Sequence, residues 1–108
     1  MLKIWHDEAW SSYLYWQTQD KKTLKRINQL LQDIERNGYE GIGKPEPLKG
    51  DLSGWWSRRI DDTNRLVYRL ADGKIEIAEC RQVLSRFMRK KERGQRFDAQ
   101  LATESASA

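Results

Sequence analysis

The feature of this sequence that most constrains its fold is an apolar stripe between residues 24 and 34. Five apolar residues recur there at i, i+3, i+6, i+7 and i+10: Leu24, Ile27, Leu30, Leu31 and Ile34. Polar and charged residues fill the positions between them, so the pattern predicts an amphipathic helix with one face in a core. We expect Asp20 to cap this helix and Asn37-Gly38 to end it in a left-handed conformation.

A second helix is predicted before it, after a short opening strand. Residues 2–5 are β-prone and precede a polar break, which favours a strand. Asp7 is a candidate N-cap for a helix that carries Trp10, Tyr13 and Trp16. The two helices then form a helical hairpin, and we interpret Trp10 and Tyr13 as core residues.

Residues 38–54 are rich in glycine and proline. Glycine stands at 38, 41, 43, 50 and 54, and Pro45 and Pro47 flank Glu46, so we expect no regular structure there. A connection of this length in a compact domain is usually functional or disordered. The glycine spacing does not follow a strand, which argues against a nucleotide-binding loop.

Three strands are predicted after this loop, over residues 55–60, 66–70 and 75–80. Residues 61–64 form a turn-rich tetrapeptide, and Asp72-Gly73 is a strong hairpin signal. We therefore predict an α+β fold in the order β-α-α-β-β-β, with the helical hairpin packed on one face of a small antiparallel sheet. The other face is expected to be free for a ligand.

Length and composition limit the remaining classes of protein. A chain of 108 residues with one cysteine and one histidine is one small domain without a disulfide framework and with too few ligands for a zinc site. We expect no metal and no other cofactor. No apolar run is long enough to span a membrane and no signal peptide opens the chain, so we expect a reduced, cytoplasmic location and no membrane partner.

The basic residues are unevenly distributed. The net charge is +4; residues 1–84 carry 14 basic against 13 acidic side chains, and residues 85–108 carry 6 against 3. Seven basic residues are interleaved with Trp55, Trp56 and Tyr68: Lys44, Lys49, Arg58, Arg59, Arg65, Arg69 and Arg81. Basic groups neutralise phosphates and aromatic rings stack on unpaired bases, which favours RNA binding. A solvated strand face is the alternative, and the residues alone leave it open.

Glu46 and the strand arginines suit a specific chemistry. Pro45 and Pro47 restrict the backbone around Glu46, so its carboxylate loses little entropy when it is aimed at one atom. Arg59 and Arg65 stand at the facing ends of adjacent predicted strands, and guanidinium groups match phosphate oxygens in bidentate fashion. Metal-independent phosphoryl transfer from an RNA 2′-hydroxyl would use Glu46 as the base and Arg65 to stabilise the developing charge. A surface ion pair is the ordinary alternative for each residue.

Five stretches carry a resemblance to a known family. They are Trp10-Ser-Ser-Tyr-Leu-Tyr-Trp16, Lys25-Arg-Ile-Asn28, Gly43-Lys-Pro-Glu-Pro-Leu-Lys49, Leu52-Ser-Gly-Trp-Trp-Ser-Arg-Arg-Ile60 and Arg65-Leu-Val-Tyr68. They lie in register within about the first 81 residues. On these motifs the chain resembles the YoeB/Txe family of toxins, within the RelE superfamily of ribosome-dependent mRNA interferases.

The resemblance implies a fold, an activity, site residues and partners. The fold would be the RelE-like microbial RNase fold, and the activity would be cleavage of mRNA in the ribosomal A site to a 2′,3′-cyclic phosphate or its opened product. The implied partners are a YefM-type antitoxin, the 70S ribosome and mRNA, with operator DNA bound only through the antitoxin complex. The family's general base corresponds to Glu46 and its phosphate-stabilising arginine to Arg65. The expected RNA- or phosphate-binding residues are Lys44, Lys49, Arg59 and Arg81.

The chain departs from the family after Arg81. The resemblance predicts a terminal Tyr-His-Tyr, with histidine as general acid, where this chain has Gln82-Val83-Leu84. Loss of a general acid typically costs about 10²–10⁴-fold in rate, so we expect a weakened activity. We divide the chain into a toxin domain over residues 1–84 and an atypical basic tail over residues 85–108, helical or disordered. A frameshift product is our interpretation of the tail; an rRNA-binding extension and a solvated tail without a role are the alternatives.

Two other functions compete with an endoribonuclease toxin. One is a catalytically disabled homologue that binds antitoxin and ribosome as a decoy or operon corepressor, which Val83 favours. The other is a general basic RNA-binding domain, whose binding would be weak, salt-sensitive and independent of the ribosome. The presence of Glu46, Arg59 and Arg65 favours the toxin, and we expect the toxin because of the family resemblance.

Overall fold

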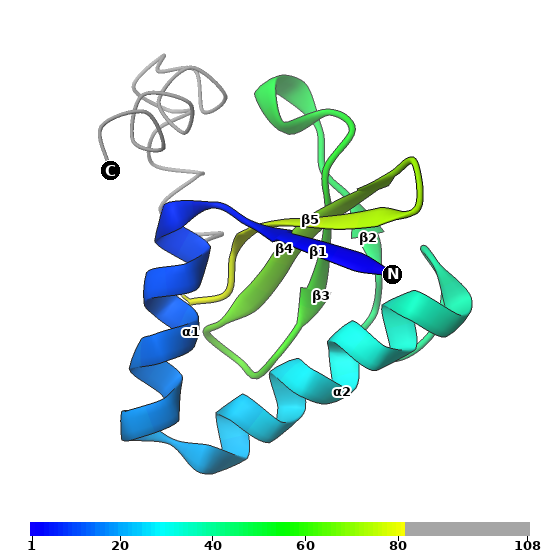
Figure 1. Ribbon diagram of the computed structural model, residues 1–108. Coiled ribbons are helices and arrows are strands. Elements are labelled where there is room, and N and C mark those ends of the chain that lie inside the picture. Colours follow the sequence, from blue (N-terminus) through cyan, green and yellow to red (C-terminus); the bar gives the residue numbers. More distant parts are fainter. Residues whose placement is uncertain (82–108) are drawn as a thin grey trace.

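Two helices lie against one face of a five-stranded sheet in the computed structural model, which describes residues 1–81 (Figure 1). The elements follow in the order β1 (Leu2–Trp5), α1 (Asp7–Gln19), α2 (Lys21–Asn37), β2 (Glu46–Pro47), β3 (Trp56–Arg59), β4 (Arg65–Ala71) and β5 (Lys74–Glu79). The predicted boundary at residue 84 and the predicted basic tail lie outside the described residues.

The sheet has the strand order β1-β5-β4-β3-β2. The α+β class and the helical hairpin on one face are confirmed, but the sheet is mixed rather than wholly antiparallel. β1 pairs with β5 in parallel, whereas the other three pairs are antiparallel. Short turns join β3, β4 and β5 and force antiparallel pairing, but no turn dictates the direction of β1, which lies at the other end of the chain from its partner.

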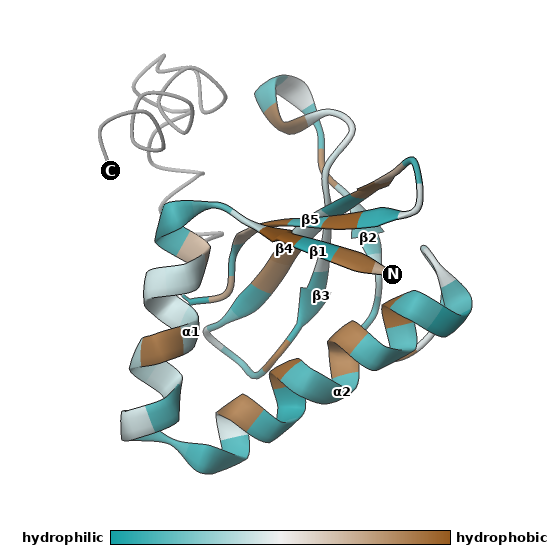
Figure 2. Ribbon diagram, viewed as in Figure 1, coloured by the Kyte–Doolittle hydropathy of each residue, from teal (hydrophilic) through white to brown (hydrophobic). Residues whose placement is uncertain are grey.

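The apolar stripe forms α2 as predicted. Ile27, Leu30 and Ile34 are fully buried, and Figure 2 shows apolar residues recurring along this helix. The Asp20 carboxylate accepts two backbone N–H bonds from the first turn, and Gly38 ends the helix at φ 65°. Among residues 1–81, no helix is both long and apolar enough to cross a bilayer.

The prediction that Asp7 caps the first helix is wrong. Asp7 is the first residue of α1, and His6 occupies the N-cap position without a side-chain bond to the helix. Asp7 therefore places a negative charge within the first turn, where the helix dipole favours it, instead of bonding the turn's N–H groups.

The aromatic residues of α1 divide between the core and the surface. Trp16 is 9 % exposed and its Nε1 donates to the carbonyl of Cys80 at 2.9 Å. Tyr13 is partly buried against the core. The prediction that Trp10 is a core residue is wrong, because it is 45 % exposed. Its ring and the Trp5 ring are in edge-to-face contact at the outer strand β1, with which no further strand pairs within residues 1–81.

Residues 46 and 47 form the edge strand β2, although no regular structure was expected between residues 38 and 54. Proline lacks a backbone donor but is tolerated on an edge strand. The pairing places Glu46 opposite Ser57 on β3. A 3-10 turn over Gly50–Leu52 then leads back toward β3.

The sheet face opposite the helices, here called the open face, is only partly free. A second apolar cluster of Leu52, Trp55, Val67 and Ala78, with Leu48 packed against it, lies apart from the main core. The loop between β2 and β3 supplies its outer members, which fold back over the central strands. The expectation of a wholly uncovered face is therefore wrong, and the remaining surface lies toward the start of β4.

Candidate active site

The open face gathers candidate site residues from β2, β3 and β4. The strand register pairs Glu46 with Ser57, and Arg59 with Arg65. Arg58 bonds to α2 and therefore points to the helix side of the sheet. Because side chains alternate along a strand, Ser57 and Arg59 point to the open face.

Glu46 and Arg65 lie close together at the centre of this site. Arg65 Nη2 is 3.9 Å from Glu46 Oε2, and the two side chains are 16 % and 59 % exposed, Arg65 being the more buried. Arg65 Nε donates to Ser57 Oγ at 3.0 Å, and Nη2 lies 3.5 Å from the carbonyl oxygen of Lys44. These contacts hold the guanidinium in place beside an accessible carboxylate. Ser57 was not predicted as a site residue; its position opposite Glu46 could be found only from the strand register.

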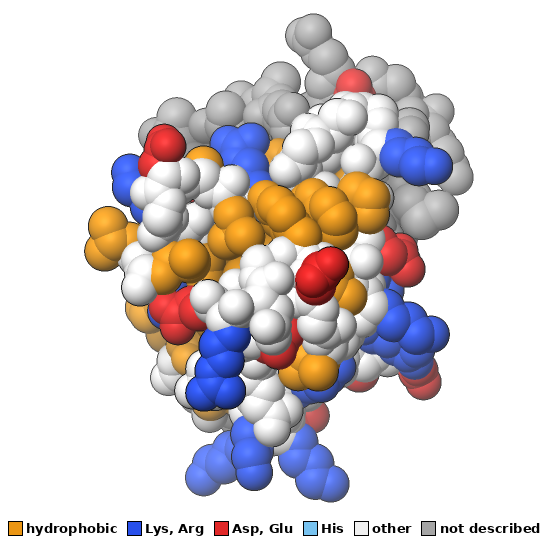
Figure 3. All heavy atoms as spheres, turned by 90° about the vertical axis from the view of Figure 1, so that its right-hand side faces the viewer, with side chains coloured by type: hydrophobic (Ala, Val, Ile, Leu, Met, Phe, Trp, Pro, Cys, Tyr) orange, Lys and Arg blue, Asp and Glu red, His pale blue; other side chains and the backbone are white. Residues whose placement is uncertain are grey.

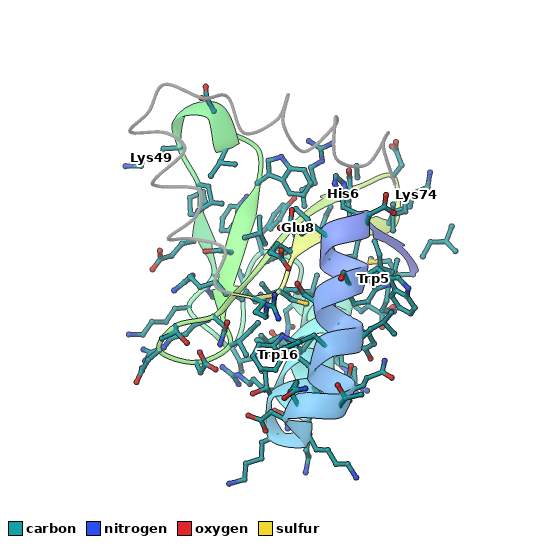
Figure 4. All side chains as sticks on the ribbon, turned by 90° about the vertical axis from the view of Figure 1, so that its left-hand side faces the viewer. Trp5, His6, Glu8, Trp16, Lys49 and Lys74 are labelled. Atoms are coloured by element: carbon teal, nitrogen blue, oxygen red, sulfur yellow. The ribbon has the colours of Figure 1, made fainter. Side chains whose placement is uncertain are left out.

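The other predicted RNA-binding residues spread out from this pair. Lys44 is exposed, with a left-handed φ of 50°, and precedes β2 by two residues. Lys49 is exposed on the loop after β2 (Figure 4). The side chain of Arg59 bonds to Asp62 in the following turn. Arg81 lies over the Tyr15 ring of α1, 4.0 Å from its centroid.

Two members of the basic cluster are internal ion pairs instead of free cations. Arg58 is fully buried and bonds to Asp33. Arg69 bonds to Glu76 through Nε at 2.8 Å and through Nη2 at 3.3 Å. These two residues are therefore paired with acidic side chains of the fold, and RNA binding by Lys44, Lys49, Arg59 and Arg81 stays a prediction. On the side shown in Figure 3, Lys and Arg side chains are likewise scattered around an apolar band, with Asp and Glu between them.

A second polar group on the sheet centres on Glu76. Its Oε2 lies 2.7 Å from Nε2 of His6, which precedes α1. The Arg69 guanidinium carbon lies 4.2 Å from the centroid of the Trp55 ring. Burial raises the pKa of Glu76, but the bonds from Arg69 and His6 outweigh it and hold that pKa below its usual value. These residues are far apart in the chain, and no sequence motif connects them.

The site contains no obvious ligand set for a metal ion. Within residues 1–81, no three His, Cys, Asp or Glu side chains converge in a way that could hold one. Cys80 is buried, and this burial raises the pKa of its thiol far above the usual range. The Glu46 carboxylate and the Arg65 guanidinium are charged groups that the fold brings together on the open face.

The chain is therefore a small α+β domain. Its helical hairpin covers one face of the sheet, and the Glu–Arg pair lies on the other face. A family model described as "YoeB-like toxin of bacterial type II toxin-antitoxin system" matches residues 5–83. The chain belongs to this family of YoeB-like toxins.

Individual relatives agree with this assignment. Toxin YoeB of Escherichia coli (strain K12) is 54 % identical over 81 residues, which are 75 % of this chain and 96 % of the relative. Toxin YoeB of Streptomyces coelicolor is 57 % identical over 73 residues, which are 68 % of this chain and 87 % of the relative. The solved YoeB/ParE toxin from Agrobacterium tumefaciens is 42 % identical with a TM-score of 0.72 and covers 75 % of this chain and 96 % of its own.

A solved heterotetrameric YoeB–YefM complex from Staphylococcus aureus contains a chain that is 49 % identical, with a TM-score of 0.72. The match covers 75 % of this chain and 95 % of that chain. Escherichia coli YafQ is only 15 % identical at a TM-score of 0.65, which shows a shared fold alone.

Proposed function

We propose that this chain is a metal-independent endoribonuclease toxin that cleaves mRNA in the A site of the 70S ribosome. The observation that carries the proposal is the pairing of Glu46 with Arg65 on the open face, at 3.9 Å. A carboxylate that is more than half exposed is accessible to a substrate hydroxyl, and a guanidinium held by Ser57 is already placed for a phosphate. Family membership adds weight to this interpretation of the pair.

The proposed reaction is a transesterification within the RNA. Glu46 takes the proton of a ribose 2′-hydroxyl, the 2′-oxygen forms a bond to phosphorus, and the bond from phosphorus to the 5′-oxygen breaks. Arg65 donates N–H bonds to the non-bridging oxygens as their charge grows. The products are a 2′,3′-cyclic phosphate and a 5′-hydroxyl. With Val83 at the place where the family resemblance puts a histidine, water or a ribosomal group supplies the proton to the 5′-oxygen.

The proposed partners follow from the same interpretation. A YefM-type antitoxin is supported by the Staphylococcus aureus YoeB–YefM complex, whose toxin chain is 49 % identical to this chain. Operator DNA would be bound only through that antitoxin complex. Lys44, Lys49, Arg59 and Arg81 would contact RNA phosphates around the Glu46–Arg65 pair.

A second candidate function is favoured by the residues that follow Arg81. Valine and leucine at positions 83 and 84 cannot donate a proton to a leaving group. A chain without this acid would still present the surfaces for antitoxin and ribosome. It would then act as a decoy or as an operon corepressor without cutting mRNA.

Toeprinting on translating ribosomes tests the first function against the second. The purified chain is compared with Glu46→Gln, with Arg65→Lys and with a chain that ends at residue 84 and carries Gln82→Tyr, Val83→His and Leu84→Tyr. We expect A-site cuts from the parent chain, no cuts from Glu46→Gln, and stronger cuts from the chain with the restored terminus. Cuts by Glu46→Gln at the parent rate would overturn the assignment of the base. Cuts from the restored terminus alone would establish the second function.

A further inference from the structure

The chain between α2 and β2 is held by one buried side chain. Arg58 is fully buried, and its Nη2 donates to the carbonyl oxygens of Gly38 at 2.7 Å and Glu40 at 2.6 Å. Its Nη1 donates to the carbonyl oxygen of Ile42 at 3.1 Å. A single guanidinium therefore satisfies three backbone acceptors along a segment of five residues that has neither helical nor strand structure.

Asp33 on α2 completes this arrangement. Its carboxylate accepts from Arg58 Nη1 and from the backbone N–H of Ile42, the latter at 3.1 Å. The bond from Arg58 is the main reason that the pKa of Asp33 lies below its usual value. Arg58 Nε also donates to the Tyr68 hydroxyl on β4 at 3.0 Å. We call this pair of side chains the Arg58–Asp33 clamp; it connects α2, β3, β4 and the loop.

Gly41 and Gly43 let the loop approach the clamp closely. A Cβ on Gly41 would lie 1.9 Å from Asp33 Oδ2, at a φ of +120° that L side chains rarely adopt. A Cβ on Gly43 would lie 2.8 Å from a Leu30 side-chain carbon and 3.2 Å from the Arg59 carbonyl oxygen. The glycines of this segment are therefore explained by contact with the clamp and its neighbours, not by a phosphate-binding loop.

The segment that the clamp holds, residues 38–42, ends shortly before the proposed catalytic carboxylate of Glu46 in the chain. The Gly43 carbonyl accepts from the N–H of Arg59 at 2.6 Å, and the Lys44 carbonyl lies 3.5 Å from Arg65 Nη2. β2 itself has only the residues Glu46 and Pro47. Proline supplies no N–H to a strand ladder, so β2 alone holds Glu46 weakly.

From these contacts we propose that the Arg58–Asp33 clamp positions Glu46 against Arg65 for catalysis, an inference that rests on the proposed function. Arg58 and Asp33 touch no substrate, so they are positioning residues. Arg59 and Arg65 lie on β3 and β4, outside the segment that the clamp holds. Lys44 and Lys49 are exposed, and charge neutralisation requires no defined contact geometry, so we expect the proposed phosphate contacts to be largely kept. Loosening the clamp should therefore lower the rate of the chemical step and leave RNA and ribosome binding nearly unchanged, because a displacement of about 1 Å can cost about 10²-fold in rate.

Three variants loosen the clamp by different means. Arg58→Lys removes the fork that spans several carbonyls, Asp33→Asn removes the charge partner, and Gly41→Ala pushes the loop away. The single-turnover cleavage rate of each variant is measured as a function of the concentration of ribosome complex. The maximal rate should be about 10- to 100-fold lower than that of the parent chain, and the half-saturation concentration should be unchanged. A rise in the half-saturation concentration as large as the fall in rate would overturn the inference, because it would indicate a general loss of binding.

A matched control separates positioning from stability. Ile34→Val shortens a fully buried side chain on α2 that has no polar group to bond to the clamp, and it is expected to lower the melting temperature. It should keep the parent cleavage rate at temperatures where every variant is folded.

A readout without catalysis keeps the inference separate from the proposed function. Hydrogen exchange at the amide of Leu48, which donates to the Trp55 carbonyl at 2.8 Å, reports the attachment of β2. We expect exchange in residues 44–48 to become at least about 10-fold faster in Asp33→Asn, and to remain at the parent rate in Ile34→Val. Unchanged exchange in Asp33→Asn would overturn the clamp's role. If the parent chain cuts no mRNA and exchange is still faster in Asp33→Asn than in the parent, the proposed nuclease function is refuted and the positional role of the clamp stands.

Discussion

Arg58 and Arg59 are neighbours in the chain, and yet one is fully buried while the other reaches a surface turn. The sequence places both among the basic residues that are interleaved with aromatic residues, and only Arg59 was predicted to bind RNA. Residues 55–60 do not alternate cleanly between apolar and polar side chains, so the face to which each arginine points cannot be read from the pattern. The strand register and the partner Asp33 decide it. At the scale of the residue, the sequence therefore shows where the arginines stand in the chain but does not predict which partner each one contacts.

Glu76 gives a residue-scale prediction about pH. Bonds from Arg69 and His6 hold the pKa of Glu76 below its usual value of 4.5 in spite of burial. A carboxyl whose pKa is lowered by folding stabilises the folded chain above its unfolded pKa, and this contribution is lost as the pH falls through the folded pKa. Glu76→Gln should therefore lower the free energy of unfolding by roughly 1 kcal/mol at pH 7.

Urea unfolding at pH 7 and at pH 3 measures this effect. The difference between the parent and Glu76→Gln should shrink at pH 3, where protonation begins to remove the ion pair from the parent as well. Glu40→Gln, which changes an exposed carboxyl, is the control and should have little effect at either pH. A difference for Glu76→Gln that stays the same at both pH values would contradict the assigned cause.

At the scale of elements, the sequence predicted the features that depend on residues close together in the chain. The apolar stripe of α2 and the turns of the β3-β4-β5 meander are such features, and both were predicted. β1 and β2 were harder, because their places depend on partners that are distant in the chain. The parallel direction of β1 and the pairing of Glu46 with Ser57 arise only when the sheet is assembled. Glu46 and Arg65 could be singled out by residue type and motif, whereas the support that they receive from Ser57 and the clamp could not.

The N-cap of α2 gives an element-scale prediction. The Asp20 carboxylate accepts from the Thr23 hydroxyl and from the N–H groups of Thr23 and Lys22. These bonds together lower the pKa of Asp20, although desolvation acts to raise it. Asp20→Ala should lower the melting temperature, and Asp20→Asn should lower it less, because asparagine still accepts these bonds. Scanning calorimetry at pH 7 checks the order. Equal losses would show that the charge matters and the capping geometry does not.

At the scale of the whole molecule, the net charge does not indicate where the candidate site lies. Residues 1–84 are almost neutral, with 14 basic against 13 acidic side chains. Arg58 and Arg69 are also paired with acidic side chains of the fold. If the proposed function is right, the site would act through a few oriented groups on the open face, and we expect long-range attraction to RNA to come from residues 85–108.

The final prediction concerns that attraction. Residues 85–108 carry 6 basic against 3 acidic side chains, and counterion release requires charge but no defined contact geometry. We expect the affinity of the full chain for 70S ribosomes to fall more steeply with salt than that of a chain ended after Leu84. Each phosphate that the shortened chain no longer neutralises should flatten the slope of log K against log salt by about 0.7 to 0.9.

A full-length control separates charge from length in this experiment. Six residues are replaced by glutamine in that control: Arg86, Arg89, Lys90, Lys91, Arg93 and Arg96. It should show the slope of the shortened chain, because the charges are removed and the length is kept. Identical slopes for all three chains would mean that the last 24 residues neutralise no phosphates. Ribosome affinity would then be carried by the folded domain, and chiefly by the arginines and lysines around Glu46.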